Sequence, residues 1–133
     1  MRRSLAIIGA AALALLPQPL LAQTKTPAPS AKPADRDVFC FIASAFTLSA
    51  MRQNEAKLNA EQKKAVPVLM QAVPYYAGRV TKRLSGDALV RALRADEPVF
   101  KASNRGVETQ GCVTSFAQGM QGIITASQSA GKK

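Results

Sequence analysis

Two cysteines are the residues of this sequence best suited to chemistry. They are Cys40 and Cys112, the only cysteines in the chain, and in an exported protein an even number of cysteines favours a disulfide over free thiols. A redox-active pair would lie close together, as in Cys-x-x-Cys, or beside a helix start with basic neighbours, whereas Cys40 stands between Phe39 and Phe41. We therefore expect one structural disulfide, which contributes roughly 4 kcal/mol in the chain-entropy model, with two free thiols as the alternative.

Side chains for catalysis or metal binding are scarce. The chain has no histidine, so the commonest general base and the commonest metal ligand are both missing. The acids are few and scattered, and we interpret Asp96 and Glu97, beside Pro98, as a solvated turn. The sequence also lacks a phosphate-binding glycine loop, a Gly-x-Ser-x-Gly elbow and a haem-attachment motif. We predict that the protein is not an enzyme and that it uses no cofactor and no metal.

The remaining chemical feature is positive charge, with 18 Lys and Arg against 8 Asp and Glu and a net charge of +10. Clustered cations of two predicted helices form a possible anion-binding surface: Arg79, Lys82, Arg83, Arg91 and Arg94. Cations near a helix C-terminus also complement the helix dipole, so part of this pattern is ordinary solvated surface. As a binding feature it favours polyanions or an anionic membrane surface. We expect no nucleic-acid partner if the chain is exported, as its N-terminal segment predicts below.

The segment "VPYYAGRV", residues 73–80, carries both tyrosines of the chain. On a helix, neighbouring side chains point about 100° apart, so we expect Tyr75 and Tyr76 not to share a surface. Tyr76 is in phase with the apolar stripe and should be buried, whereas Tyr75 should lie at the rim beneath Arg79. Gly78 should allow close approach of another backbone. The alternative is a partner groove for an apolar or aromatic group, formed by Pro74, Tyr75, Gly78 and Arg79.

The N-terminal segment predicts that the chain leaves the cytoplasm. Arg2 and Arg3 precede an apolar core at 5–16, and Ala22 follows at a plausible cleavage point, which is the layout of a secretory signal peptide. A membrane span needs about 20 apolar residues, and this core is shorter. We predict cleavage near Ala22 and a periplasmic location, with secretion beyond the periplasm as a further possibility.

The rest of the chain divides into a linker, one domain and a tail. Residues 23–35 are proline-rich and polar, which is typical of a disordered linker. Residues 36–128 are enough for one small helical domain, and residues 129–133 form a flexible basic tail.

The domain is predicted to be all-α, with four helices joined by short connections. Asp35 or Asp37 caps a first helix, which ends at "NEAKLN". Asn59 and Gln62 form a capping-box pattern at the start of a second helix. An apolar stripe then continues in phase to residue 84 through Pro67 and Pro74. We favour one helix bent at one or both of these prolines over two shorter helices.

Two further helices complete the domain. Ser85 caps a third helix, which should end near "ADEP" because of Pro98. The last helix carries an apolar side made of Cys112, Phe116, Met120, Ile123 and Ile124. It also carries small residues at helical spacing, namely Gly111, Ser115, Gly119 and Gly122. Because each interior glycine costs close to 1 kcal/mol relative to alanine, we expect close helix packing, within the domain or across a dimer.

Three short parts of the sequence resemble those of a known group of proteins. A cysteine near the start of the first helix, the "YYAGRV" segment before "LSG", and a second cysteine in the last helix resemble small exported helical proteins of alphaproteobacteria. The resemblance covers most of residues 39–120, implies an all-helical, disulfide-linked periplasmic domain, and carries no activity over. The plan is also similar to that of the acid-stress periplasmic chaperones, although this chain has wider cysteine spacing and lacks their acidic composition.

Two functional hypotheses follow. The first is a non-enzymatic periplasmic helical module that binds another envelope protein, as an accessory or stress-protective component, and is a monomer or weak homodimer. The second is a basic binder of the envelope surface that recognises anionic lipid or lipopolysaccharide.

Overall fold

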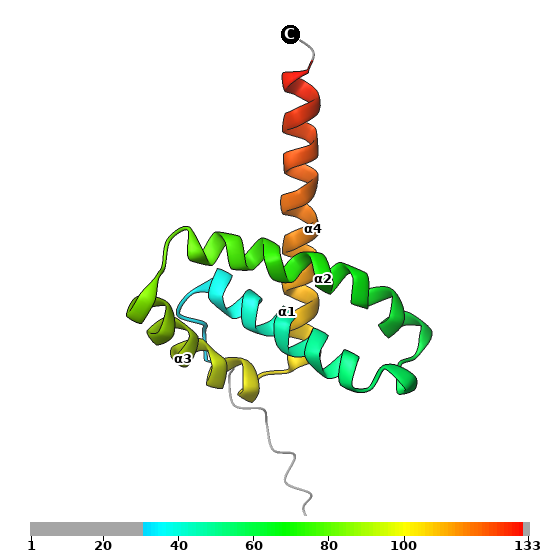
Figure 1. Cartoon of the computed structure of the whole chain (residues 1–133), viewed down its shortest axis with the longest axis vertical. Coiled ribbons are helices and arrows are strands. Elements are labelled where there is room, and N and C mark those ends of the chain that lie inside the picture. The colour runs from blue at the N-terminus through cyan, green and yellow to red at the C-terminus, as the bar shows by residue number, and fades with distance from the viewer. Residues whose placement is uncertain (1–30, 132–133) are drawn as a thin grey trace, which may run out of the picture.

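The computed structural model describes residues 31–131, and in this part all of the regular secondary structure is helical. The elements are α1 (Arg36–Gln53), the short 3-10 turn η1 (Glu55–Lys57), α2 (Ala60–Thr81), α3 (Gly86–Ala102) and α4 (Arg105–Ala130). α1 lies centrally and contacts each of the other three helices, and α4 crosses the α1–α2 pair (Figure 1). The prediction of an all-α domain with four helices is confirmed. The predicted signal peptide, 1–22, and most of the predicted linker lie outside the described residues.

Local signals in the sequence set three of the helix starts. The Asp35 carboxylate caps α1 by accepting hydrogen bonds from the amides of Asp37 and Val38, at 3.0 and 3.2 Å. At α2, the Asn59 side chain accepts from the Gln62 amide, and the Gln62 side chain accepts from the Asn59 amide, which completes the predicted capping box. At α4, the cap is Asn104. The sequence therefore specifies these starts through contacts within a few residues.

The start of α3 differs from the expected side-chain cap. Ser85 stands at the predicted N-cap position, but its side chain makes no capping hydrogen bond. The next residue, Gly86, has a φ of +50°, in the left-handed region that glycine adopts without steric cost. The turn into α3 therefore depends on the backbone freedom of this glycine.

The three prolines of the domain lie inside helices. α2 continues through Pro67 and Pro74, so one helix, not two, spans residues 60–81. The prediction that α3 ends near Pro98 is wrong, because α3 continues through that proline to Ala102. Each proline leaves the carbonyl four residues earlier without its helical donor. All three prolines are exposed, as are the residues that carry those carbonyls, so water can replace the lost hydrogen bonds: Pro67, Pro74, Pro98, Lys63, Met70 and Arg94.

The core lies where α1, α2, α3 and α4 meet, and the predicted disulfide crosses it. Cys40 of α1 and Cys112 of α4 are bonded, with their Cα atoms 5.3 Å apart and both residues at most 1% exposed. The buried residues around the bond are Val38, Phe39, Ile42, Ala43, Ala72, Tyr76, Val80, Phe100 and Phe116. The predicted disulfide is confirmed, and it covalently joins the first helix of the domain to the last.

The last helix extends beyond the rest of the domain. Figure 1 shows the C-terminal half of α4 projecting away from the other helices. Residues 121–131 are all exposed, and the helix reaches Ala130, two residues past the predicted end of the domain at 128. Within residues 31–131, no helix combines the length and the hydropathy that a membrane span requires.

Candidate functional site

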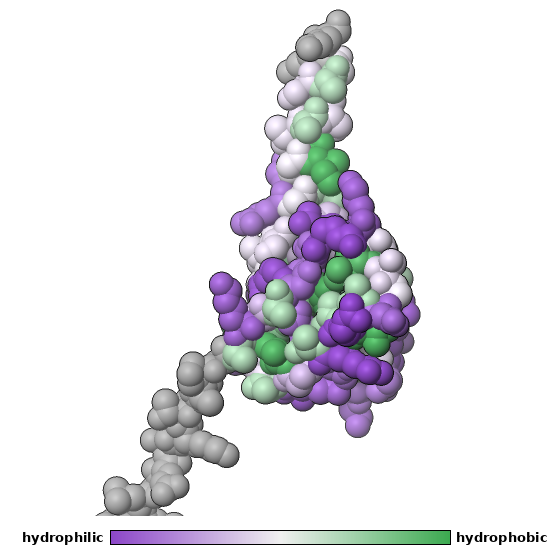
Figure 2. Space-filling view, turned by 90° about the vertical axis from the view of Figure 1, so that its left-hand side faces the viewer, coloured by the Kyte–Doolittle hydropathy of each residue, from purple (hydrophilic) through white to green (hydrophobic). Residues whose placement is uncertain are grey.

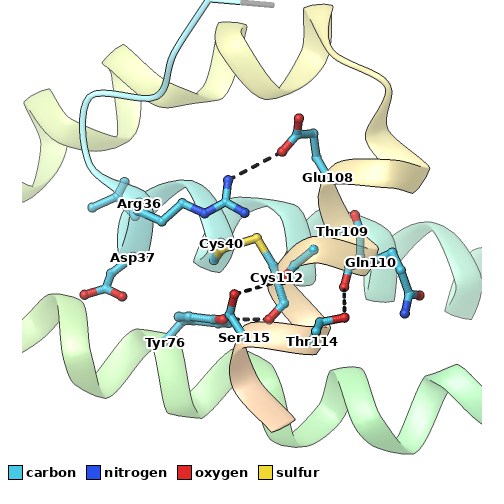
Figure 3. The surroundings of a disulfide bond; sticks show 12 residues. Arg36, Asp37, Cys40, Tyr76, Glu108, Thr109, Gln110, Cys112, Thr114 and Ser115 are labelled. Carbon is cyan, nitrogen blue, oxygen red and sulfur yellow. Dashed lines mark hydrogen bonds and ion pairs between the residues drawn. A yellow bond between two sulfur atoms is a disulfide. The ribbon is translucent and has the colours of Figure 1, made fainter. Parts of the chain in front are cut away.

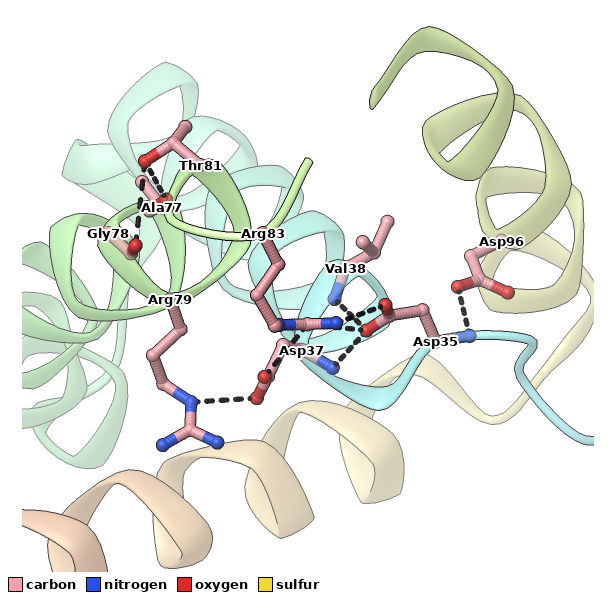
Figure 4. Close-up of polar contacts among 9 residues, drawn as sticks. All are labelled: Asp35, Asp37, Val38, Ala77, Gly78, Arg79, Thr81, Arg83 and Asp96. Atoms are coloured by element: carbon pink, nitrogen blue, oxygen red, sulfur yellow. Dashed lines mark hydrogen bonds and ion pairs between the residues drawn. The ribbon is translucent and has the colours of Figure 1, made fainter. Parts of the chain in front are cut away.

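The predicted cationic surface is partly neutralised by acids at the start of α1. The Arg83 guanidinium donates to both oxygens of Asp35, at 3.1 and 3.2 Å, and to Asp37 at 3.1 Å. Arg79 donates to the other oxygen of Asp37 at 2.9 Å (Figure 4). The hydrogen bond from Arg83 lowers the pKa of Asp35 below its ordinary value, against the opposing effect of burial. Two of the five predicted anion-binding cations therefore already have carboxylate partners.

The other three predicted cations have a different environment. Lys82, Arg91 and Arg94 are exposed. Among the described residues, no carboxylate lies within ion-pair distance of them. These three side chains are the part of the predicted surface that can still attract an anion.

The two tyrosines lie together against α4, contrary to the expectation that they occupy separate surfaces. Tyr76 is 3% exposed, as predicted, and its hydroxyl donates to the Cys112 carbonyl at 2.7 Å (Figure 3). Burial raises the pKa of this phenol. The Tyr75 ring packs edge-on against Tyr76 and Phe116, with centroid separations of 5.1 and 5.2 Å. Because α4 crosses α2, it offers a surface wide enough for two side chains that leave α2 in different directions.

The remaining expectations for this segment have mixed outcomes. Arg79 does stack on Tyr75, with its guanidinium carbon 5.7 Å from the ring centroid. Gly78 is not a contact glycine, because a Cβ at this position would meet nothing within 4 Å. Pro74 and Gly78 are exposed, and Tyr75 is half-buried. The five cavities described for residues 31–131 are lined by other residues, so none of them corresponds to the predicted groove.

The contact glycine is on α4 instead. A Cβ on Gly119 would collide with the hydroxyl of Tyr75. Gly111 lies beside the Arg36 side chain, whereas Gly122 faces open space. Packing within the domain therefore accounts for Gly119 but leaves Gly122 without a partner among the described residues.

A buried carboxylate is the residue that the sequence interpretation missed. Asp96 is 0% exposed, and its two oxygens accept from the amides of Ala34 and Asp35, at 2.7 and 3.0 Å. It is not part of a solvated turn, because α3 continues beyond it. The helical spacing of the sequence could have indicated this burial. Asp96 lies on the apolar face of α3, after Leu89 and Leu93 and before Phe100. Its contacts fix the last two residues of the predicted linker, directly before α1, to the domain.

An apolar hollow surrounds Met51, where α1 ends and α2 begins. Met51 lines three cavities, with volumes of ≈ 360, ≈ 520 and ≈ 430 Å³. We call these three cavities together the Met51 hollow. Their apolar lining includes Phe46, Leu58, Val66, Leu69, Met70 and Val113. Large apolar side chains are incompletely covered here: Phe46 is 41% exposed and Met70 is 49% exposed.

The predicted apolar side of α4 has two different environments. Cys112 and Phe116 are buried in the domain, and Met120 is half-buried at its edge. Ile123 and Ile124 continue the same side beyond the domain and are 56% and 44% exposed. Figure 2 shows an apolar patch on the projecting part of α4. The stripe that packs the first half of the helix is therefore uncovered in the second half.

Comparison of the chain with protein-family models, with curated proteins and with solved structures finds no match. Within residues 31–131, no group of three His, Cys, Asp or Glu side chains is arranged to hold a metal ion. The resemblance to exported helical proteins stays a prediction. Function must therefore be inferred from the three surfaces described above: the exposed cations, the Met51 hollow and the projecting half of α4.

Proposed function

We propose that this protein is a non-enzymatic helical module of the periplasm that binds another envelope protein through the projecting half of α4. The observation that carries the proposal is the continuity of one apolar stripe. The face that packs Cys112 and Phe116 against the domain continues outside it as Ile123 and Ile124, where no described residue covers it. Full burial of an isoleucine side chain contributes about 1.5–3 kcal/mol, so a partner would gain substantially from this face.

The electrostatics of the segment support a protein partner. Residues 109–131 contain no Asp, Glu, Lys or Arg, although charged residues make up 20% of the chain. A helix without charges can pack against an apolar or neutral helix without desolvating any charge. Gly122 fits the same interpretation, because its missing side chain allows another backbone close. The expected partner surface is accordingly a neutral, apolar helix.

Site-specific photo-crosslinking in the native host tests this proposal. A photoreactive residue replaces Ile123 in one variant and Thr125 in the control variant. Thr125 is two residues further along the same exposed turn, so it points away from Ile123. We expect one discrete adduct with another envelope protein from position 123 and none from position 125. The same adducts from both positions, no adduct, or an adduct of two copies of this chain would contradict the proposal.

The second candidate is a binder of anionic lipid or lipopolysaccharide, and the observation that favours it is a set of cations without a carboxylate partner among residues 31–131. Lys82, Arg91 and Arg94 are available, whereas Arg79 and Arg83 are engaged with α1. Under this candidate function, the protein binds anionic vesicles at low salt, and added salt removes the binding. The charge-reversed variant Arg91→Glu with Arg94→Glu would also lose it. Under the first proposal, no vesicle binding is expected at any salt concentration.

A further inference from the structure

The Met51 hollow is a second surface, separate from the projecting half of α4. It is formed by the end of α1, by η1, by the first half of α2, by Phe100 of α3 and by the start of α4. Each of its three cavities, between ≈ 360 and ≈ 520 Å³, has the volume of a small-molecule site, for which about 300–1,000 Å³ is typical. Because Met51 lines all three, they surround a single flexible side chain.

The lining is apolar and adaptable. Two of the three methionines in the domain, Met51 and Met70, contribute to the hollow, together with Phe46 and Leu58. Methionine is unbranched and polarizable, so it adjusts to the shape of a bound apolar group. The exposure of Phe46 and Met70 shows that these walls have surface left to bury.

The rim of the hollow is cationic. Arg52 and Lys63 line the largest of the three cavities, and Arg105 lines a second. In the described part of the chain, no carboxylate lies within ion-pair distance of these three cations. The acids at the rim are Glu55, and Glu61, which is paired with Lys64 at 2.9 Å. Among the described residues, the rim therefore carries three cations without a carboxylate partner and one carboxylate, Glu55, without a cation partner.

We propose that the Met51 hollow binds a free single-chain amphiphile with an anionic headgroup, of the class of long-chain carboxylates. The alkyl chain lies among Met51, Leu58 and Met70, and the headgroup lies at Arg52 and Lys63. A cationic amphiphile is disfavoured by the sign of the rim. A partner helix does not fit inside the hollow. A helix is about 10–12 Å across with its side chains, so the largest cavity, of ≈ 520 Å³, has the volume of only about one helical turn.

Titration calorimetry of the exported protein, with its disulfide intact, tests the proposal with monomeric dodecanoate as the probe. We expect saturable binding of one dodecanoate per chain. Dodecyltrimethylammonium, which has the same chain length and the opposite charge, should bind at least about tenfold more weakly. No saturable binding of dodecanoate, or equal binding of the two amphiphiles, would overturn the proposal. Binding to anionic vesicles without binding of monomeric dodecanoate would also overturn it, in favour of a membrane-surface role.

Two variants locate the site. Met70→Asp places a charge in the apolar wall at a half-exposed position, and the pair Arg52→Glu with Lys63→Glu reverses the rim. Each should weaken dodecanoate binding by about tenfold or more, while circular dichroism and the thermal midpoint verify folding. The control pair, Lys32→Glu with Arg36→Glu, changes the net charge equally on exposed residues that do not line the hollow and should leave the affinity unchanged. Equal loss in the control pair would contradict the proposed location.

This proposal does not depend on the proposed function of α4. The crosslinking experiment probes Ile123, and the calorimetry probes the hollow, so either result stands if the other fails.

Discussion

The two ends of the α1–α2 pair are built from similar residues but packed to different degrees. At the disulfide end, around Cys40 and Cys112, large side chains are closed off, with Phe39 at 1% and Tyr76 at 3% exposure. At the Met51 end, around the hollow, Phe46 and Met70 are 41% and 49% exposed. The difference shows that hydrophobic residues in a helical stripe do not by themselves make a core.

The difference follows from how fully α3 and α4 cover the α1–α2 pair, because both also reach the Met51 end but leave Phe46 and Met70 half-exposed there. The disulfide end is covered by α3 and α4, and it is fastened by a covalent bond and by edge-on aromatic contacts between Tyr75, Tyr76 and Phe116. At the Met51 end, the chain turns from α1 into α2 through η1, which has no buried residue of its own. Closed packing at one end supports the fold, and incomplete packing at the other leaves room for a ligand.

The largest expected difference in unfolding free energy is between substitutions of two α2 residues, one at the disulfide end and one at the Met51 end. Tyr76→Ala removes a buried ring and its hydrogen bond to the Cys112 carbonyl, so it should cost roughly 3–5 kcal/mol of unfolding free energy. Met70→Ala, in the hollow, should cost about 1 kcal/mol or less, because the side chain is half-exposed. Denaturant melts of the two variants measure both values. Similar costs would mean that the two ends are equally packed.

The second largest loss of unfolding free energy is expected at Asp96, which holds the end of the linker against α3. Asp96→Ala leaves the amides of Ala34 and Asp35 without acceptors and should cost about 2–3 kcal/mol. The control is Glu97→Ala, the neighbouring residue, whose ion pair with Lys101 is partly exposed and contributes about 0.5 kcal/mol at most. Amide hydrogen exchange at Ala34 and Asp35 should accelerate in the first variant only. Unchanged exchange at these two amides would show that Asp96 does not hold the linker.

Two glycines of α4 test where tight packing ends. Gly119→Ala should cost about 1–3 kcal/mol, because the new methyl group collides with Tyr75. In a Tyr75→Ala background, the same substitution should become neutral or stabilising. Gly122→Ala should stabilise the helix by up to about 1 kcal/mol, because nothing lies within 4 Å of the new Cβ. Thermal melts of the single and double variants measure the coupling, and additive effects would contradict the contact.

The smallest expected effect is electrostatic, at the start of α1. The pKa of Asp35 is lowered in the folded protein by its hydrogen bond to Arg83, against the opposing effect of burial. The contribution of this carboxylate to stability is therefore fully present above the ordinary pKa of 3.8 and is lost as the pH falls through the lower folded value. Arg83→Gln should flatten the fall in unfolding free energy over this acidic range. The fall would be equally steep in both proteins if the ion pair did not contribute.

Much of the fold could be predicted because it depends on residues close together in the sequence. The capping box of Asn59 and Gln62 and the cap of Asp35 each join residues two or three positions apart. The apolar stripes follow the same local periodicity. The disulfide spans 72 positions, but with only two cysteines the sequence allowed one intramolecular pairing.

The candidate sites depended instead on how the helices cross. The sequence placed Asp96 on the inner face of α3, but only the approach of the linker supplied the two amides that make its burial possible. Likewise, the sequence alone indicated that Arg83 is a free cation, whereas the tertiary structure places Asp35, at the start of α1, beside it. The stripe of α4 continues unchanged in the sequence through Ile123, and only the extent of the other helices decides where it is uncovered. Periodicity fixes which face of a helix is apolar, whereas the crossing of helices fixes how much of that face is covered.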